Sequence, residues 1–410
     1  MNDPQKPIVR PAKPEEIHTA ALVAQIAFES KETLPWEAPA EWLARNKSLD
    51  YFVAAEIDGK IVSSLITVPS LSIFGSDVIQ LASVGSVATL PEYRRRGCAG
   101  AMMEYVVKSL YEKEHVLSAL WPFSFPYYRK FGWELGGESK TYNISAEIAS
   151  SLGEPDKTRP ASVADLPAIF ELSNRAAKHY NCITVRDAEW WQIQCTMRRF
   201  IFDCEAKPNE NEIAIWLSEI DGKIEGYCMY KLCKDEKGDT IAEALELTAE
   251  TNQAKNNLIA SMTNTDAQKI VIDLPADAVI LSAIENPRAV ECKISPGFQF
   301  RVVNPKTALK MLTVDPSLTG KIGLSIIDPV LGKTSFTIEA EKGRVFTTEQ
   351  KRSEEVSMNI QTFSQIFSGY LRPKQAAYIG KIAPSFGREI ELLEALMPKR
   401  LPYRSKMELG

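Results

Sequence analysis

The amino-acid sequence predicts an α+β fold in which two similar units, each a mixed sheet with flanking helices, precede a third unit. The hexapeptide EIDGKI occupies residues 56–61 and returns letter for letter at residues 219–224, each time between two strand-like apolar runs. From about Phe298 the pattern changes to strands separated by Gly or Pro turns, followed by a helix with an apolar stripe. We therefore expect three domains, with limits at residues 1–152, 153–297 and 298–410.

The first unit is expected to contain strands and helices in a fixed order. Residues 7–30 predict a short strand, a Pro-containing turn and a helix. Residues 51–74 form two apolar runs around Asp58-Gly59, a dipeptide typical of a tight hairpin. A further strand at 78–89 is followed after Gly97 by apolar positions at helical spacing and then by the strand-like HVLSALWPF.

The second unit repeats this order around its own copy of EIDGKI. The helix-like ASVADLPAIFELSNRAAKHY precedes it, and the strand-like IAEALELTA and the helix-like AKNNLIASM follow it. Six identical residues could also arise by chance around a common turn. Where the first unit has YRRRGCAG, the second has NQAKNNLI. A duplicated domain that lost its arginines and glycine is expected to be a scaffold and not a second active site.

The composition of the 410 residues is that of an ordinary globular protein, with 45% hydrophobic and 25% charged residues. The N-terminal segment lacks the apolar core of a signal peptide, and no run approaches the roughly 18 apolar residues of a membrane helix. A net charge of −5 argues against general nucleic-acid binding. The seven cysteines form no CxxC pair and the three histidines stand alone. We expect a cytoplasmic protein with no metal, no membrane and no nucleic-acid partner.

Three adjacent arginines, at positions 94–96, lead into Gly97 at the start of the predicted helix. Like charges side by side repel, so folding alone gives little reason for this combination. A helix N-terminus presents free N–H groups and the positive end of the helix dipole, which suits a pyrophosphate. The alternative is a solvated basic helix start in which the glycine serves only the turn. Neither a P-loop nor a Rossmann fingerprint is present.

The stretch from Arg94 to Ala99, RRRGCA, resembles the RxxGxA/G motif of the acetyl-coenzyme A binding acetyltransferases of the GNAT superfamily. The wider PEYRRRGCAGAMMEYV, together with SALWPFSFPYYRKFGWELGG, resembles one branch, the Eis (enhanced intracellular survival) type N-acetyltransferases. The resemblance extends over nearly the whole chain. It implies tandem GNAT-like acetyltransferase domains, the second degenerate, followed by a sterol-carrier-like domain, and a homo-oligomer that in this branch is a hexamer.

The resemblance also implies how acetyl-CoA is held. The strand before the motif offers backbone hydrogen bonds to the pantetheine arm, and the N–H groups from Arg95 to Gly100 hold the pyrophosphate. Arg94 or Arg95 reaches the other phosphates. Cys98 is expected to be a bystander, although a helix N-terminus could lower its pKa. The expected cofactor-binding residues are Val87, Ala88, Thr89, Arg94, Arg95, Gly97, Cys98, Ala99 and Gly100.

Acetyl transfer to an amine requires a proton for the leaving thiolate. A thiolate whose pKa is roughly 8.5 can take a proton from a nearby tyrosine with a pKa of about 10. The resemblance assigns this role to Tyr128, because Tyr128 to Trp133, YRKFGW, matches the Y-x-R/K-F-G-aromatic segment that carries the family's general acid. Tyr127 is the neighbour most easily confused with it, and aromatic residues of such a cluster commonly serve packing alone.

The Eis branch brings its own C-terminal carboxylate into the active site. The chain ends PYRSKMELG, whereas related chains end with an acidic residue followed by a large apolar one. This pattern aligns Glu408 and Leu409 with the end of related chains and leaves Gly410 as one extra residue. The candidates for the group that accepts the proton of the substrate are therefore a terminal carboxylate at Leu409 or Gly410 and the side chain of Glu408. A chain of water molecules is a further candidate. If the tail enters the active site, we expect deletion of residues 406–410 to cut turnover severely while leaving thermal stability nearly unchanged, because a chain end contributes little packing unless it is docked.

The acceptor amine is the least constrained feature of the sequence. The resemblance implies polyamine-like substrates, aminoglycosides among them, and in some members lysine side chains of proteins or peptides. Glu29 and Glu408 would suit a polycation, although both could be solvated surface residues. Trp36, expected in a loop, and Phe123 are candidate walls of the pocket. A lipid carrier that uses the third domain is the alternative of another class.

Overall fold

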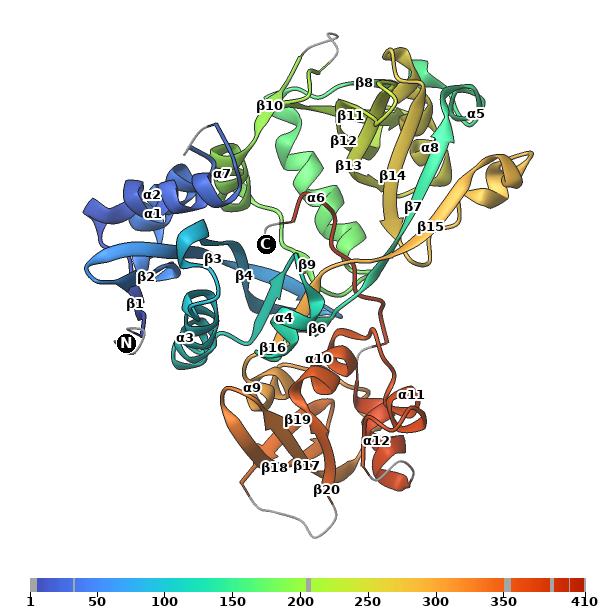
Figure 1. Cartoon of the computed structure of the whole chain (residues 1–410). Helices are drawn as coiled ribbons and strands as arrows, with labels where there is room; N and C mark the ends of the chain where they lie inside the picture. Colours follow the sequence, from blue (N-terminus) through green and yellow to red (C-terminus); the bar gives the residue numbers. More distant parts are fainter. Residues whose placement is uncertain are drawn as a thin grey trace. The chain divides into compact units, whose positions relative to one another are not determined.

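The computed structural model describes residues 6–31, 34–203, 208–349, 355–383, 387–397 and 399–408 of the chain. It divides the chain into two compact units. The first unit comprises Met1–Gly137, Gly297–Pro402 and Leu409–Gly410, and the second comprises Glu138–Pro296 and Tyr403–Glu408. Figure 1 shows the elements of both units along the chain.

The first unit contains a mixed sheet in the order β1-β2-β3-β4-β5-β16-β6. Strands β4 and β5 pair in parallel, and the other neighbours are antiparallel. Helices α1 and α2 lie on one side of the sheet and α3 on the other (Figure 1). The elements are β1 (Ile8–Pro11), α1 (Ile17–Ala27), α2 (Leu34–Asn46), β2 (Phe52–Ile57), β3 (Lys60–Phe74), β4 (Asp77–Thr89), α3 (Cys98–Glu112), β5 (Leu117–Leu120), α4 (Phe125–Arg129), β6 (Glu134–Leu135) and β16 (Gln299–Val302). The predicted order of strand, helix, hairpin, strand, helix and strand corresponds to β1, α1, β2–β3, β4, α3 and β5, whereas the sequence did not predict helices α2 and α4.

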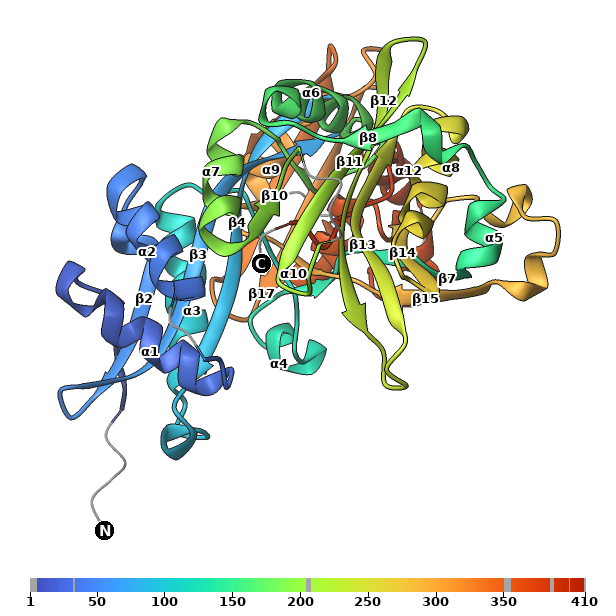
Figure 2. The same ribbon diagram turned by 90° about the horizontal axis from the view of Figure 1, so that it is seen from above.

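The second unit contains a sheet in the order β10-β11-β12-β13-β14-β7-β15, with β8 paired to β11. Strands β11 to β14 lie side by side in Figure 2. The elements are β7 (Glu138–Ser145), α5 (Ala146–Ser150), β8 (Thr158–Pro160), α6 (Leu166–Ala177), β9 (Ile183–Thr184), α7 (Ala188–Met197), β10 (Arg199–Ile201), β11 (Glu212–Ile220), β12 (Lys223–Lys234), β13 (Thr240–Ala249), α8 (Asn252–Ser261), β14 (Lys269–Pro275) and β15 (Glu291–Pro296).

The two sheets exchange strands along the chain. Strand β7 follows β6 directly in sequence, yet it pairs with β14 and β15 of the second sheet. Strand β16 follows β15, yet it pairs with β5 and β6 of the first. Residues 138–152, which the sequence assigns to the first domain, therefore contribute β7 and α5 to the second unit. The domain limits at 152 and 297 stay predictions, because the two compact units are divided where the strands change sheets, at residues 137–138 and 296–297.

Both copies of EIDGKI form the same hairpin. Asp58 and Gly59 connect β2 to β3 with φ of 51° and 75°, and Asp221 and Gly222 connect β11 to β12 with φ of 51° and 76°. Two successive positive φ angles belong to the tight turn that matches the right-handed twist of the strands. Both hairpins have a bulge at the corresponding place, after Ala55 in β2 and after Ser218 in β11.

A cluster of three charged residues is also duplicated beside each hairpin. In the first unit the guanidinium of Arg10 donates to Glu16 at 2.7 Å and to Glu56 at 2.8 Å. In the second unit Arg159 donates to Asp165 and to Glu219, each at 2.8 Å. Glu16 and Asp165 each also accept a hydrogen bond from the backbone N–H three residues earlier, at the start of the following helix. These equivalent contacts support a duplication and not a chance repeat.

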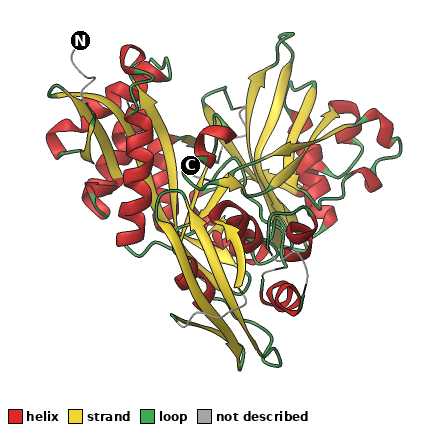
Figure 3. Ribbon diagram, turned by 60° about the horizontal axis from the view of Figure 1, so that its bottom comes forward, coloured by secondary structure: helices red, strands yellow, loops and turns green. Residues whose placement is uncertain are grey.

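The third sheet lies within the first compact unit, in the order β19-β18-β17-β20. Helix α10 packs on β16, where the N–H of Val302 donates to Ser364 Oγ at 2.9 Å and Phe74 stacks on Phe300 and Phe367. Figure 3 shows that the chain combines helices with strands, in agreement with the predicted α+β class. The elements are α9 (Pro305–Lys310), β17 (Gly320–Asp328), β18 (Gly332–Glu341), β19 (Arg344–Thr348), β20 (Glu355–Asn359), α10 (Ile360–Ser368), α11 (Pro373–Tyr378) and α12 (Arg388–Leu396). In the described part of the chain, no helix has the length and apolar character needed to cross a membrane.

The Arg10 cluster predicts a pH-dependent contribution to stability. Arg10 lowers the pKa of Glu16 to about 2, so the ionised carboxylate stabilises the fold above pH 4.5 and loses this effect as the pH falls toward 2. We expect Glu16→Gln to lower the free energy of unfolding by about 1 to 2 kcal/mol at pH 6, since partial exposure screens the pair. Urea denaturation should show a smaller difference at pH 3. The exposed Glu15→Gln is the control, and a difference independent of pH would contradict the prediction.

Candidate active site

Strand β4 carries a bulge that changes its direction close to its end. Ser64 of β3 faces Ala88 and Ile66 faces Gly85, so Leu65 alone lies opposite two residues of β4. One of these two, Ser86, has a φ of 56°. An extra residue in one strand bends that strand and interrupts the ladder. Behind the bulge, Ser63 Oγ donates to the carbonyl of Ala88 and fixes the bent segment.

The bulge coincides with the point where β4 leaves β5. The described ladder between the two strands runs from Leu81, opposite Leu117, to Val84, opposite Leu120. Strand β4 itself continues to Thr89. The backbone groups of Ser86 to Thr89 that face β5 are therefore outside this ladder. An extended chain with amide groups is the type of ligand that can pair with such an edge.

The segment that follows β4 forms a turn in front of α3. Arg95 has a φ of 65° and Gly97 has a φ of 83°, a left-handed conformation that glycine adopts without a steric cost. The N–H of Ala101 donates to the carbonyl of Gly97 at 2.9 Å, so the N–H groups of the residues between them have no acceptor within the helix. No side chain of the described residues caps this end, and a Cβ on Gly97 would meet no atom within 4 Å.

The three arginines of this turn are exposed but differ in their contacts. Arg94 Nε donates to the carbonyl of Thr89 at 3.4 Å. The guanidinium of Arg96 lies over the ring of Tyr93, 4.9 Å from its centroid. Lys60 places its ammonium group 5.3 Å from the same ring. The turn and the uncapped helix end thus form a site with positive charge and free N–H donors, which is what an anion requires.

Cys98 lies at this helix end but is 2% exposed. Burial raises the pKa of its thiol, and the charge of Arg96 offsets this only partly. The thiol therefore stays protonated at neutral pH, in accord with the expected bystander.

Tyr128 lies in α4 within a cluster of aromatic rings. Its ring centroid lies 5.1 Å from that of Tyr127 and 5.3 Å from that of Phe123. Tyr128 is 3% exposed, whereas Phe123 is 72% exposed at the margin of the cluster. Burial raises the pKa of Tyr128 well above its ordinary value and that of Tyr127 to about 12. Both phenols are therefore neutral proton donors at physiological pH.

The segment after Tyr128 is held against α3 by a residue that the sequence did not single out. A Cβ on Gly100 would lie 3.6 Å from the ring of Phe131, so this segment packs beside the first turn of α3. Arg301 of β16, which is fully buried, donates from Nη1 to the carbonyl of Phe131 at 2.6 Å and from Nη2 to Asp328 at 2.5 Å. Gly132 has a φ of 91°, and any side chain on it would collide with the Arg301 guanidinium. The glycine of the YRKFGW segment is the only sequence signal for this contact.

Trp36 and Glu29, two of the residues expected on the acceptor side, form a group with Phe28. Trp36 lies in the first turns of α2 and not in a loop, because the helix already begins at Leu34. Its ring stacks on Phe28 at 5.7 Å, and Phe28 is 54% exposed. Glu29, directly after Phe28, is exposed. Among the described residues, no ring contact joins this group to Phe123 or Tyr128. The sequence analysis did not single out Phe28, although its exposed ring makes it a candidate for ligand contact.

The end of the chain differs from the expectation in two respects. The Glu408 side chain is 0% exposed, and Arg186 donates to its carboxylate at 3.0 Å. This buried pairing does not suit the exposed substrate ligand that the sequence predicted. Met407 is also 0% exposed, so the expectation that the tail adds little to stability is wrong. Leu409 and Gly410 lie outside the described residues, and no statement on their carboxylate follows from the structure.

The corresponding helix of the second unit, α8, has a different N-terminus. The side chain of Thr251 accepts a hydrogen bond from the N–H of Ala254 at 3.2 Å and thereby caps the helix. No residue from 250 to 254 has a positive φ. The free donors that mark the α3 end are thus partly consumed in α8, in keeping with a degenerate second domain. Within the described ranges, no group of three or more His, Cys, Asp or Glu residues is placed to hold a metal ion.

Comparison with protein families identifies three domains in the chain. An acetyltransferase (GNAT) domain matches residues 8–136, a second acetyltransferase (GNAT) domain matches residues 182–302, and a sterol carrier protein domain matches residues 305–405. The chain therefore belongs to the GNAT acetyltransferases, a family of N-acetyltransferases that use acyl-CoA. A sequence search of curated proteins finds no match.

Solved structures with the same fold extend over nearly the whole chain. A GCN5-related N-acetyltransferase from Anabaena variabilis is 18% identical, with 98% of each chain covered and a TM-score of 0.78. A protein of unknown function from Enterococcus faecalis, described as a probable N-acyltransferase, is 23% identical, with 97% of each chain covered and a TM-score of 0.78. Eis1 from Mycobacterium abscessus is 18% identical, with 97% of this chain and 98% of that chain covered and a TM-score of 0.73. The family matches confirm the predicted arrangement of two GNAT domains and a sterol carrier domain, and these structures share its fold over nearly the whole chain.

Arg301 should be essential to the segment that carries Tyr128. Arg301→Met leaves the Asp328 carboxylate and the Phe131 carbonyl buried without their partner, which should cost about 3 to 5 kcal/mol in the free energy of unfolding. Denaturant titration of the full chain measures this loss, and adding Asp328→Asn should restore part of it. The control is Arg45→Met, which removes an exposed ion pair and should cost less than about 1 kcal/mol. Equal losses in the two variants would refute the role of Arg301.

Proposed function

We propose that the protein transfers an acetyl group from acetyl-CoA to a primary amine of a polyamine-like substrate, such as an aminoglycoside. The observation that carries this proposal is the diverging edge of β4 followed by the uncapped start of α3. An extended thioester arm and a pyrophosphate need these two features side by side. Acetyl-CoA supplies the acetyl group as an activated thioester.

The chain's own residues would hold the cofactor by backbone contacts. Val87, Ala88 and Thr89 offer amide groups to the arm, and the N–H groups from Arg95 to Gly100 converge on the pyrophosphate. Arg94 and Arg95 are exposed and available to the phosphates, whereas Arg96 is engaged with the ring of Tyr93. Gly97 keeps the approach clear, because even a Cβ at this position would meet no atom within 4 Å, and Ala99 adds only a methyl group.

Tyr128 is the proposed general acid for the departing thiolate. Its phenol is buried and neutral, and a thiolate that forms in the same desolvated surroundings is a stronger base than in water. The packing of Tyr128 against Tyr127 and Phe123 fixes the direction of its ring. A carboxylate of the C-terminal tail, at Gly410 or at the position of Leu409, is proposed to accept the proton of the attacking amine.

The acceptor site is proposed from residues of the first unit alone. Phe123 and Phe28 present exposed aromatic surface, the half-buried Trp36 stacks on Phe28, and Glu29 adds a carboxylate beside Phe28. Aromatic faces and carboxylates both attract ammonium groups. A lysine side chain of a protein or peptide carries the same ammonium group and is the second candidate acceptor. A hexameric assembly is proposed from the family resemblance, and light scattering tests it.

The direct test is release of free thiol from acetyl-CoA in the presence of a panel of amines. Aminoglycosides, simple polyamines and lysine-containing peptides are compared at equal concentration, with acetyl-CoA alone as the background. Faster release with the polyamines than with the peptides supports the proposal. No amine-dependent release from any member of the panel would sink it.

Tyr128→Phe keeps the ring and its packing but removes the proton. Turnover should fall by about 100-fold or more, with cofactor affinity little changed, whereas Tyr127→Phe should be much milder. Because burial raises the pKa of Tyr128 above its ordinary value, wild-type kcat should not decline between about pH 8 and pH 10 through loss of this proton. Steady-state kinetics over this range measure both effects. The reverse ranking of the two variants would reassign the acid.

The arginines should contribute unequally to cofactor binding. Arg94→Ala and Arg95→Ala should each weaken acetyl-CoA affinity by about 1 to 3 kcal/mol, as expected for a charge-assisted contact, and Arg96→Ala should do less. Calorimetry measures these affinities and should also give one cofactor per chain, because Thr251 caps the corresponding helix of the second domain. Equal losses at the three positions would indicate a diffuse electrostatic patch, and two cofactors per chain would contradict the degenerate second domain.

A further inference from the structure

The second domain has kept the strand divergence of the first. Its β12–β13 ladder pairs Met229 with Glu246 and Tyr230 with Ala244, so Leu245 is an extra residue in β13. The described β13–β14 ladder ends at Ala244, opposite Ile272, although β13 continues to Ala249. As in β4, a bulge thus stands where two parallel strands separate. Beyond Ala244, the backbone N–H and C=O groups of β13 that face β14 no longer pair with that strand, so they need other hydrogen-bond partners.

The C-terminal hook, residues 403–408, lies in this gap. Its backbone contacts β13 at the bulge, where the N–H of Lys406 donates to the carbonyl of Leu245 at 3.2 Å. The Lys406 ammonium pairs with Glu243 of β13 and with Asp273 of β14, each at 2.7 Å. One lysine of the hook therefore ties together the two strands that diverge.

The hook is also held from α7 and from the segment before it. Gln194 Nε2 donates to the carbonyl of Met407 at 3.0 Å, and Arg198 donates to the same carbonyl at 3.1 Å. Tyr403 N–H donates to the carbonyl of Asn181 at 2.9 Å. Met407 itself is 0% exposed in a core cluster with residues of β11 and β12. Backbone and apolar contacts thus fix the hook on both sides.

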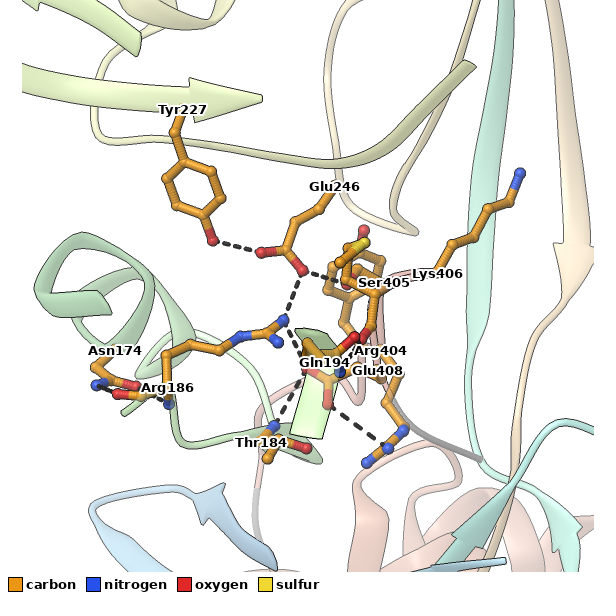
Figure 4. Close-up of polar contacts among 12 residues, drawn as sticks. Asn174, Thr184, Arg186, Gln194, Tyr227, Glu246, Arg404, Ser405, Lys406 and Glu408 are labelled. Carbon is orange, nitrogen blue, oxygen red and sulfur yellow. Dashed lines mark hydrogen bonds and ion pairs between the residues drawn. The ribbon is translucent and has the colours of Figure 1, made fainter. Parts of the chain in front are cut away.

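A buried ion network locks the last described residue of the hook (Figure 4). Arg186 Nη2 donates to Glu246 at 2.6 Å and to Glu408 at 3.0 Å, and all three side chains are at most 5% exposed. Glu408 also accepts the backbone N–H of Thr184 at 3.3 Å. Arg404 of the hook stands 3.6 Å from the other carboxylate oxygen of Glu408. Buried charges are tolerated only when paired in this way, so the network makes the position of the hook specific.

The gap is wider than the hook. A cavity of about 200 Å³ remains beside it, with walls from α6, from the end of β13 and from Tyr403, Ser405 and Glu408 of the hook. Core side chains do not close this side of the gap. The contacts of the hook are thus those of a ligand seated in a cleft and not those of a strand in the sheet.

We infer that the cleft of the second GNAT domain has become a receptor for the chain's own C-terminal segment. The domain that lost its anion site kept the separated strands and uses them to bind the segment that contains Met407 and Glu408. Recognition rests on the carboxylate of Glu408, the ammonium of Lys406 and the buried Met407 side chain. This inference does not depend on the transferase proposal, since neither test below measures activity.

The first test is digestion of the full chain with a carboxypeptidase, followed by mass spectrometry. Release of Met407 and Glu408 requires the hook to leave the cleft, so it should be slow in the wild type. Lys406→Met removes both ion pairs to the diverging strands and should speed this release about tenfold or more. The control is Lys269→Met on β14, whose lysine is 41% exposed and ion-paired like Lys406, which is 37% exposed. Two synthetic peptides, one with the wild-type C-terminal sequence and one with Lys406→Met, show how fast the carboxypeptidase digests each sequence when it is free.

The second test supplies the hook as a separate peptide. A chain ending at Pro402 should bind a labelled Tyr403–Gly410 peptide, measured by fluorescence anisotropy, and Glu408→Gln in the peptide should weaken binding about tenfold or more. If the shortened chain does not fold, the digestion of the full chain decides. A folded shortened chain that fails to bind the peptide overturns the inference. Release of Met407 from the wild type as fast as from the free peptide overturns it as well.

Discussion

Two parallel strands can separate only if the backbone groups at their facing edges find other partners. In the first unit β4 leaves β5 after Val84 because a bulge at Ser86 turns the strand. The separated edge, the turn at Arg94–Gly97 and the uncapped α3 follow one another along the chain, so the bulge sets the position of all three. The candidate site therefore depends on one bulge in the sheet. The surrounding side chains line the backbone edge that the bulge leaves unpaired.

The second unit shows what the same framework does when its helix end is closed. The hairpin, the charged cluster and the bulge are retained, as Asp221-Gly222, Arg159 and Leu245 demonstrate. Thr251 caps α8, so the donors that would meet a phosphate are partly used within the chain. The hairpin and the core serve folding in both units, whereas the open helix end of the first unit is not needed for folding.

Two buried guanidinium groups illustrate how the fold fixes functional segments. Arg301 connects the segment after Tyr128 to Asp328 of the sterol carrier domain, and Arg186 connects Glu246 to the chain end at Glu408. Removing a charge from water is costly, and this cost is offset only at a position where each donor meets its acceptor. Such contacts add little net stability compared with apolar residues, but they favour one arrangement over its neighbours. Both lie where a segment must be held in a single position.

The sequence by itself determined the local structure of this protein. Asp58-Gly59 and Asp221-Gly222 specify hairpins because few other residues accept two positive φ angles, and Gly97 specifies the turn into α3 for the same reason. The helix α3 and the YRKFGW segment could also be predicted from the sequence, because both depend on residues that lie within a few positions of one another. Tertiary structure alone decided that β7 and β16 exchange sheets, that Arg301 supports Phe131 and that Met407 and Glu408 are buried. These features join residues that are tens or hundreds of positions apart, and the pairing of distant backbone and charged groups leaves no periodic trace in the sequence.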